Sequence, residues 1–156
     1  FKFGVTGCQN NCLKAEENDM GIKGGLIINW EPENCTFCGV CAKACREGAI
    51  TVKDDNLDLD RSKCNHCGRC VKSCPTEAWQ GQSGYLLSFG GLFGNRIEKG
   101  RQFLPITSNL QRVLKVSDAA LEFFTIHGTS GERFRSVIER TGWEKLIKVV
   151  EEAAHG

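Results

Sequence analysis

The sequence predicts an α+β fold, and three observations lead to that class. Eight of the ten cysteines fall into two runs of the same spacing, each followed by a short apolar stretch, which indicates a repeated loop, short helix and short strand. Apolar strand-like segments stand on both sides of this repeat. In residues 107–154 apolar side chains recur near the period of an amphipathic helix. Strands in one part of a chain and helices in another are typical of α+β proteins.

Length and composition describe an ordinary small globular protein of one or two domains. The chain has 156 residues, of which 40% are hydrophobic and 25% charged, and its net charge is +1. A near-neutral charge does not favour nucleic acid as a partner. The sequence also lacks an apolar run of the length that spans a membrane, about 18 residues. It has no recognisable signal peptide and begins with Phe, so we expect a piece of a longer cytoplasmic protein.

The cysteine count has two readings. Ten cysteines in a short chain could form as many as five disulfides in a secreted scaffold. Eight of them, however, follow the spacing C-x2-C-x2-C-x3-C, which is typical of metal ligation in a reducing cytoplasm. The spacing therefore favours a metalloprotein.

The first segment, residues 1–25, precedes the repeat. Phe3–Val5 is expected to form a short strand that leads into a cysteine-bearing loop, and Ala15–Glu17 a short helix or turn. Gly21–Gly25 is expected to be the end of a strand followed by a loop.

The middle segment, residues 26–80, is an internal repeat. Each cysteine of the first run recurs 29 residues later, beginning with Cys35 and Cys64. Each half is interpreted as a cysteine-bearing loop, a short helix and a short strand. We expect the fourth cysteine of each run to open the helix that follows and to point away from the first three. A further strand is expected over 57–60.

The last segment, residues 81–156, is expected to be a strand followed by helices. Tyr85–Phe89 is apolar and runs into the glycine-rich stretch 90–94. Three helices are predicted beyond it: one between an N-cap at Ser108 and a stop at Gly128, one from Phe134 to near Gly142, and one around Leu146–Val150.

The two cysteine runs predict two [4Fe-4S] clusters. Such a cluster takes one thiolate per iron, and two-residue spacers let one loop offer three thiolates to the same cluster. In two-cluster proteins the fourth cysteine of each run ligates the other cluster, so we expect a crossed assignment. The expected ligands are Cys35, Cys38, Cys41 and Cys74 for one cluster, and Cys64, Cys67, Cys70 and Cys45 for the other.

Zinc is the alternative for these cysteines, because four thiolates also suit a tetrahedral zinc ion. The third cysteine at the same spacing, the C-x3-C tail and the doubling of the run favour iron–sulfur clusters. Cys74 is followed by Pro75, as the pattern expects. Cys45 is followed by Arg46, a departure that could alter the local backbone.

None of the three histidines is predicted to be a metal ligand. His66 lies between two cysteines of the second run and is interpreted as a solvent-facing loop residue, although a hydrogen bond that tunes a cluster is the other possibility. His127 and His155 lie in the helical part and are interpreted as surface or helix-end residues.

Residues 26–80 resemble the bacterial two-[4Fe-4S] ferredoxins in their two cysteine runs. The resemblance implies a ferredoxin-like fold with a pseudo-twofold βαβ repeat and one-electron transfer at low potential.

The flanking segments carry a second set of motifs. Residues 6–12 read T-G-C-Q-N-N-C, residues 21–24 read G-I-K-G, and residues 84–91 read G-Y-L-L-S-F-G-G. Together they resemble the sirohaem-binding half of the sulfite and nitrite reductases. The order of the motifs is similar to that of the anaerobic and dissimilatory members. It implies that the ferredoxin domain, 26–80, is inserted into a partial sirohaem and [4Fe-4S] domain made of 1–25 and 81–156.

The resemblance also implies roles for the first loop. In that family a C-x5-C pair and a later C-x3-C pair hold one [4Fe-4S] cluster, and the last cysteine bridges it to the sirohaem iron. Cys8 and Cys12 then correspond to ligands of a third [4Fe-4S] cluster, with Cys12 as the bridge, and Asn10 and Asn11 to donors toward the cluster sulfides or a sirohaem carboxylate. No C-x5-C pair precedes Cys8, so we expect an incomplete site here, and free thiols or a disulfide are the alternative.

For function, the resemblance implies that the intact protein reduces sulfite to sulfide. Electrons would come from an electron-donor protein or subunit through the ferredoxin domain, and nitrite is the alternative substrate. This chain alone is expected not to be catalytic. A stand-alone ferredoxin-type electron carrier or a redox sensor is the alternative, and the loop at Cys8 and Cys12 favours the reductase.

Overall fold

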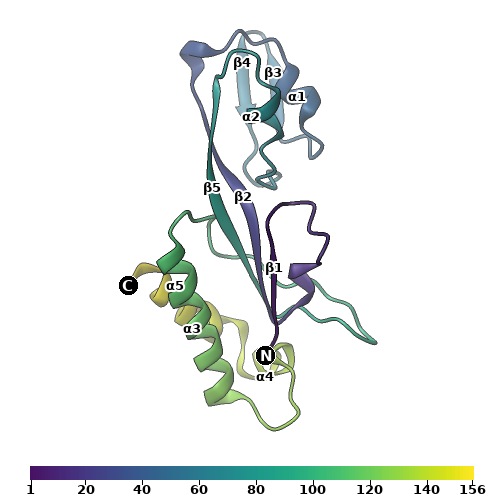
Figure 1. Cartoon of the computed structure of the whole chain (residues 1–156), viewed down its shortest axis with the longest axis vertical. Coiled ribbons are helices and arrows are strands. Elements are labelled where there is room, and N and C mark those ends of the chain that lie inside the picture. The colour runs from purple at the N-terminus through teal and green to yellow at the C-terminus, as the bar shows by residue number, and fades with distance from the viewer. The chain divides into compact units, whose positions relative to one another are not determined.

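The computed structural model describes all residues from 1 to 156 (Figure 1). Its strands are β1 (Phe3–Thr6), β2 (Met20–Trp30), β3 (Ile50–Lys53), β4 (Asn56–Leu59) and β5 (Trp79–Phe89). Its α-helices are α1 (Val40–Ala44), α2 (Arg69–Ser73), α3 (Leu110–His127), α4 (Phe134–Thr141) and α5 (Trp143–His155). Two single turns of 3-10 helix are η1 (Ala15–Glu17) and η2 (Pro32–Asn34). The mixture of strands and helices agrees with the predicted α+β class.

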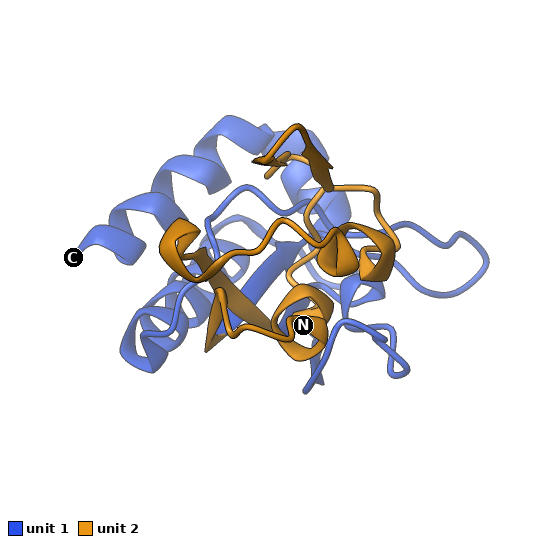
Figure 2. Cartoon of the chain, turned by 90° about the horizontal axis from the view of Figure 1, so that it is seen from above, with its two compact units in different colours: residues 1–24, 84–156 blue, residues 25–83 orange.

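The chain divides into two compact units, coloured separately in Figure 2. Unit 1 consists of residues 1–24 and 84–156, and unit 2 of residues 25–83. Strands β2 and β5 each contribute residues to both units. They lie in one three-stranded sheet of order β1-β2-β5, in which β1 runs parallel to β2 with Phe3 opposite Met20.

Strand β2 is longer than the sequence suggested. The expected loop at Gly24 and Gly25 is wrong, because the strand continues through both glycines to Trp30. A Cβ atom on Gly24 would lie 2.4 Å from the carbonyl oxygen of Gly7. A glycine within a strand is typical of such a close backbone approach, so this one allows contact with the Cys8 loop and does not end the strand.

In unit 2 the two halves of the repeat have the same backbone. The N-caps Gly39 and Gly68 both have positive φ, 73° and 72°, a conformation that glycine adopts without strain. The third cysteine of each run lies within α1 or α2. The fourth, Cys45 or Cys74, is the C-cap of that helix, so the expectation that it opens the following helix is wrong.

Arg46 does not disturb this geometry. Cys45 before Arg46 has φ −76° and ψ 107°, and Cys74 before Pro75 has φ −71° and ψ 119°. A proline restricts the preceding residue to this extended region. Cys45 adopts the same region without that restriction, so the departure from the sequence pattern leaves the cysteine backbone unchanged.

Unit 1 is built around the C-terminal helices. Its core joins apolar residues of the sheet to one face of each helix, including Met20, Leu87, Phe89, Val116, Phe134, Ile138, Leu146 and Val150. Helix α3 begins one residue later than predicted: its N-cap is Asn109, whose side chain accepts a hydrogen bond from Arg112 N at 3.1 Å, and not Ser108. The predicted end at Gly128 is confirmed, as is the break between the last two helices at Gly142.

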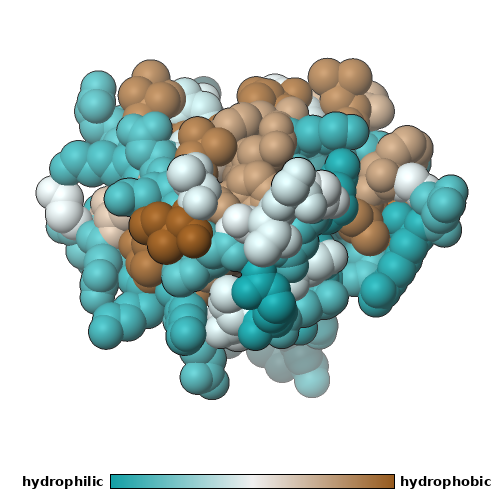
Figure 3. Space-filling model, turned by 90° about the horizontal axis from the view of Figure 1, so that it is seen from below, coloured by the Kyte–Doolittle hydropathy of each residue, from teal (hydrophilic) through white to brown (hydrophobic).

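The surface carries scattered apolar side chains. Figure 3 shows, on one face, hydrophobic groups in brown interspersed with hydrophilic groups in teal. Isolated exposed apolar residues of this kind are ordinary on protein surfaces. No helix in the structure is both long enough and apolar enough to cross a membrane.

Candidate metal centres

Unit 2 contains two cavities lined by cysteines. Cavity one is lined by thiols from both halves of the repeat: Cys35, Cys38, Cys41 and Cys74; its empty volume, which includes space open to solvent, is about 290 Å³. Cavity two is lined by the complementary set: Cys45, Cys64, Cys67 and Cys70; its empty volume, measured in the same way, is about 330 Å³. The fold thus brings the first three cysteines of each run together with the fourth cysteine of the other.

Apolar side chains complete both cavities. Leu57 and Trp79 line cavity one, and Ile28 and Ile50 line cavity two. All four are at least nine-tenths buried. The core of unit 2 therefore forms part of the lining around each group of thiols, whose members range from the buried Cys41 and Cys70 to the exposed Cys38.

The thiols of the two cavities differ in burial and in their hydrogen bonds. All ten cysteines of the chain are free, and Cys41 and Cys70 are buried. Burial raises the pKa of Cys41, and the nearby indole N–H of Trp79 partly offsets this increase. Burial also raises the pKa of Cys70, to about 11. Burial also tends to raise the pKa of Cys74, but the Thr76 hydroxyl and backbone N–H groups outweigh it and lower the pKa. Neighbouring donors thus favour the thiolate of Cys74, the form that binds metal.

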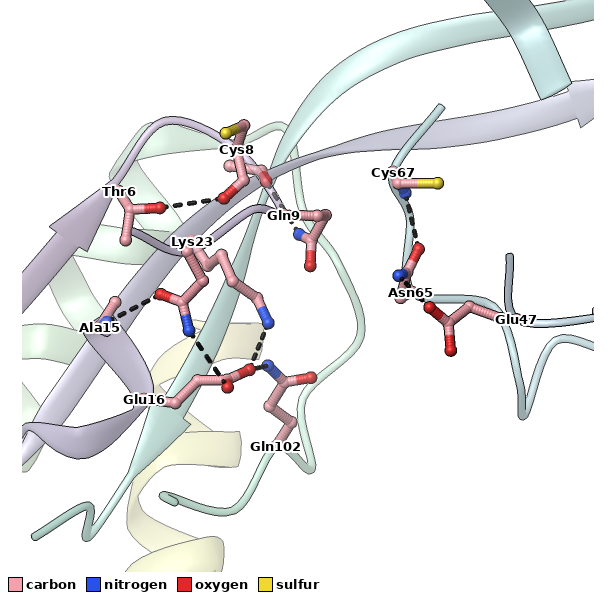
Figure 4. Close-up of polar contacts among 12 residues, drawn as sticks. Thr6, Cys8, Gln9, Ala15, Glu16, Lys23, Glu47, Asn65, Cys67 and Gln102 are labelled. Atoms are coloured by element: carbon pink, nitrogen blue, oxygen red, sulfur yellow. Dashed lines mark hydrogen bonds and ion pairs between the residues drawn. The ribbon is translucent and has the colours of Figure 1, made fainter. Parts of the chain in front are cut away.

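Backbone N–H groups donate to two of these sulfurs. Phe37 N donates to Cys35 Sγ and Ala49 N donates to Cys45 Sγ, both at 3.4 Å. At Cys67 the backbone N–H is directed instead to Asn65 Oδ1 at 3.1 Å, and Asn65 Nδ2 donates to Glu47 at 2.9 Å (Figure 4). The sulfurs therefore lie in a fixed polar frame as well as an apolar wall.

Four thiols line each cavity together. No group of three or more His, Cys, Asp or Glu side chains in the chain has a geometry that could hold a single metal ion. A [4Fe-4S] cluster instead presents four separate irons, each with its own thiolate. The four thiols that line each cavity match this donor set.

His66 does not line either cavity. Its side chain is half-buried, and Nδ1 lies 3.1 Å from the carbonyl oxygen of Leu26 in β2. The backbone carbonyl of His66 accepts a second hydrogen bond from Leu26 N at 2.8 Å. The residue fastens the cysteine loop to β2, in a less exposed position than the solvent-facing one we expected.

The loop with Cys8 and Cys12 lies in unit 1, and both thiols are exposed. The loop is fixed at its beginning, where the Thr6 hydroxyl donates to the carbonyl of Cys8 at 3.0 Å. Gln9 Nε2 donates to the carbonyl of Gly24 at 2.8 Å, next to the close approach of Gly7 and Gly24 (Figure 4). The two cysteines are thus exposed to solvent on a loop whose backbone is held by hydrogen bonds.

The two asparagines of this loop play different parts. Asn11 is engaged within the loop: its Oδ1 accepts from Ala15 N at 2.8 Å, and its Nδ2 donates to Glu16 at 3.3 Å. Asn11 also has a positive φ of 52°, a conformation that asparagine tolerates better than most residues. Asn10 is exposed. Asn10 is thus the better placed of the two to donate to a bound group.

A charged network under the loop was not foreseen from the sequence. The ammonium of Lys23 pairs with the carboxylate of Glu16, which also accepts from Gln102 Nε2 at 3.2 Å (Figure 4). Lys23 is the one charged residue in an otherwise small and apolar stretch of β2, and that contrast is the signal that could have indicated a buried partner.

Comparison with known proteins places the chain among reductase domains. Residues 1–155 match the family described as the nitrite and sulphite reductase 4Fe-4S domain. The chain is 30% identical over 155 residues to the coenzyme F420-dependent sulfite reductase of Methanocaldococcus jannaschii, covering 97% of this chain and 25% of the relative. It is 45% identical over 83 residues to one of the subunits of the anaerobic sulfite reductase of Salmonella typhimurium, covering 51% of this chain and 25% of the relative. The matched regions thus span about a quarter of the length of these relatives.

The fold is also found in a solved structure. A crystal structure of dissimilatory sulfite reductase I superposes with a TM-score of 0.66 over 97% of this chain and 42% of that one, at 20% sequence identity. Both units therefore occur within a fold already known from a sulfite reductase.

Proposed function

The chain belongs to the family of nitrite and sulphite reductase 4Fe-4S domains, and on that premise we propose that it carries electrons through two [4Fe-4S] clusters to the catalytic centre of a sulfite reductase. The observation that carries the proposal is the lining of each cavity in unit 2 by four thiols, three from one cysteine run and one from the other.

The residues present suit two such clusters. In the proposal the cluster of cavity one is held by Cys35, Cys38, Cys41 and Cys74, and that of cavity two by Cys45, Cys64, Cys67 and Cys70. A [4Fe-4S] cluster supplies reversible one-electron transfer when bound. The chain supplies the thiolates, the N–H groups directed at Cys35 and Cys45, and apolar side chains in the lining of each cavity.

The acceptor in this proposal is a sirohaem coupled to a third [4Fe-4S] cluster. Cys8 and Cys12 would supply two of its thiolates, with Cys12 shared between cluster and haem, and Asn10 would donate a hydrogen bond. Two thiols do not complete a four-thiolate site, so the chain's own residues fit only half of it. The other ligands would come from residues outside 1–156.

Sulfite is the proposed substrate of the whole protein, because the matched relatives are named as sulfite reductases. Nitrite is the second candidate, since the family name includes both anions. One relative is named as a subunit of its enzyme, which supports an electron-donor protein or subunit as the partner.

A stand-alone ferredoxin-type electron carrier is the alternative function. Unit 2 alone would suffice for it, because both thiol-lined cavities lie there. The tied-down loop that presents Cys8 and Cys12 favours the reductase, since a simple carrier has no use for it.

Iron and sulfide analysis of the chain, with its optical spectrum, tests the proposal. After reconstitution without oxygen we expect about eight irons per chain, four for each cluster, and no zinc. Chlorin-type haem bands are not expected from the chain by itself. Binding of zinc in place of iron, or a stoichiometry of about four irons, would contradict the two-cluster proposal.

A further inference from the structure

The two cavities can be compared position by position through the repeat. The offset of 29 residues relates Cys45 to Cys74, and it relates the other lining residues in the same way. Apart from cysteines and glycines, four such pairs line cavity two and cavity one, in that order: Ile28 and Leu57, Glu47 and Thr76, Ile50 and Trp79, and Asn65 and Thr36. The first pair is apolar in both cavities and the last is polar in both, so among the paired positions the chemical difference lies in the second and third.

Trp79 gives cavity one a donor that cavity two does not have. The side chain is 2% exposed, and its Nε1 is buried near Cys41 without a hydrogen bond of ordinary geometry in the protein. Its counterpart Ile50 is 6% exposed and has no polar atom. A buried N–H without an acceptor costs about 1–3 kcal/mol, so such groups in native proteins usually have a partner. The acceptors at this place are the sulfurs of cavity one and of whatever occupies it.

The second pair adds to the same difference. The Thr76 hydroxyl lies 3.6 Å from Cys74 Sγ, where it can donate to the sulfur. At the equivalent position of cavity two, Glu47 carries a carboxylate that accepts from Asn65. At these two positions cavity one has side-chain donors where cavity two has an apolar group and a carboxylate. Cavity two is also lined by Asn65, whose Nδ2 donates to Glu47, and by the cationic Arg69, so the Glu47 carboxylate is not the only charge there.

We propose that the two clusters are unequal, and that the cluster in cavity one has the higher reduction potential because the Trp79 N–H donates a hydrogen bond to one of its sulfurs. The inference rests on the proposed function, since it requires that both clusters are present. Reduction adds one negative charge to a cluster, and a hydrogen bond to sulfur stabilises the more negative state. Thr76 acts in the same direction, whereas in cavity two the negative charge of Glu47 and the positive charge of Arg69 oppose each other.

The consequence is a preferred place for the electron. An external one-electron reductant that adds a single electron to the chain leaves it in cavity one, whichever cluster it meets first. Movement from cavity two to cavity one oxidises one cluster and reduces the other by one electron each, and no bond is made or broken. Trp79 is a positioning residue in this sense: it ligates no metal and biases where the electron resides.

The test compares Trp79→Phe with the matched variant Ile50→Val at the equivalent position. Both keep an apolar side chain, but only the first removes an N–H. Reconstituted proteins are titrated with dithionite without oxygen, and both couples are followed by EPR. We expect Trp79→Phe to lower the reduction potential of the upper couple by about 59 mV, which is a tenfold change in the equilibrium constant for one electron. The reduction potential of the lower couple should not change. Ile50→Val should move neither couple by a comparable amount.

Several outcomes would overturn the inference. They are an unchanged upper couple in Trp79→Phe, a shift of the lower couple instead, or equal shifts of both couples. If Trp79→Phe fails to fold, Ile50→Trp supplies the reciprocal test. A new N–H in cavity two should raise the reduction potential of the lower couple and so reduce the difference between the two potentials. An unchanged difference between the potentials contradicts the inference. Iron analysis separates this failure from that of the proposed function, because a wild-type chain with fewer than about eight irons refutes the two clusters themselves.

Discussion

Lys23 in β2 and Glu16 in η1 form a buried ion pair under the loop that presents Cys8 and Cys12, with side chains 11% and 14% exposed. A buried charge that loses its partner is costly, because no water replaces the lost interaction. The pair therefore stabilises the base of the loop only while both members are present.

Replacing one member should destabilise unit 1 strongly. We expect Lys23→Met to lower the free energy of unfolding by about 3 kcal/mol, because it leaves the largely buried Glu16 carboxylate without a counter-charge and only Asn11 and Gln102 still donate to it. Urea unfolding followed by circular dichroism measures this. Lys63→Met is the control: Lys63 pairs with Asp60 at 3.3 Å but is 60% exposed, so its loss should cost less than about 1 kcal/mol. An equal decrease in the free energy of unfolding in both variants would contradict a larger contribution from the buried Lys23 pair.

Gly24→Ala should disturb the loop although it adds a single methyl group. The new Cβ would lie 2.4 Å from Gly7 O, so the backbones must separate, at a cost of about 1–3 kcal/mol. The hydrogen bond from Gln9 to Gly24 should weaken as well. Gly7→Ala is the matched control, since a Cβ there meets nothing within 4 Å. Thermal melting and amide exchange of the loop should separate the two variants, and similar behaviour would argue against the close approach.

The crossed ligand sets can be tested by pairs of cysteine substitutions. Cys35 and Cys74 line the same cavity, so replacing both by alanine should remove one cluster and leave about four irons per chain. Cys35 and Cys45 belong to one run but line different cavities, so the same treatment should damage both clusters. Iron analysis and EPR spin counts measure the result. The reverse pattern would show that each run holds its own cluster.

The turn before α4 should show an acid titration well below the ordinary range. Hydrogen bonds from the Arg140 guanidinium at 2.8 and 3.1 Å, with further help from Thr129, lower the pKa of Glu132 from 4.5 to about 2. A lowered carboxyl pKa contributes stability above pH 4.5, and this contribution is lost as the pH falls toward about 2. NMR titration of the Glu132 carboxyl carbon measures the midpoint. It should return toward 4.5 in Arg140→Met, and an unchanged midpoint would remove Arg140 as the cause.

Much of the fold could be predicted because the signals are local. The ends of α3 and α4 could be predicted because glycine is common just after the last turn of a helix, and Gly128 and Gly142 each follow a run of apolar residues with the helical period. The strand β2 was cut short because a glycine pair normally indicates a loop, and only the approach of Gly7 shows why Gly24 lies within a strand. The assignment of the N-cap to Ser108 and not Asn109 failed by one residue, since both types can cap a helix.

The sequence by itself determined the chemistry of this protein: the thiolate donors, their number and the repeat that duplicates them, because spacing along a chain limits which ligands one loop can offer. The sequence also predicted the crossed sets of four cysteines, and the same sets line the two cavities. The tertiary structure decided that Lys23 meets Glu16 and that the indole of Trp79 lies where its repeat partner Ile50 has only carbon atoms. These features depend on residues far apart in the chain. They arise from the packing of a shared core, where burial and close contact determine the partners and local sequence preference does not.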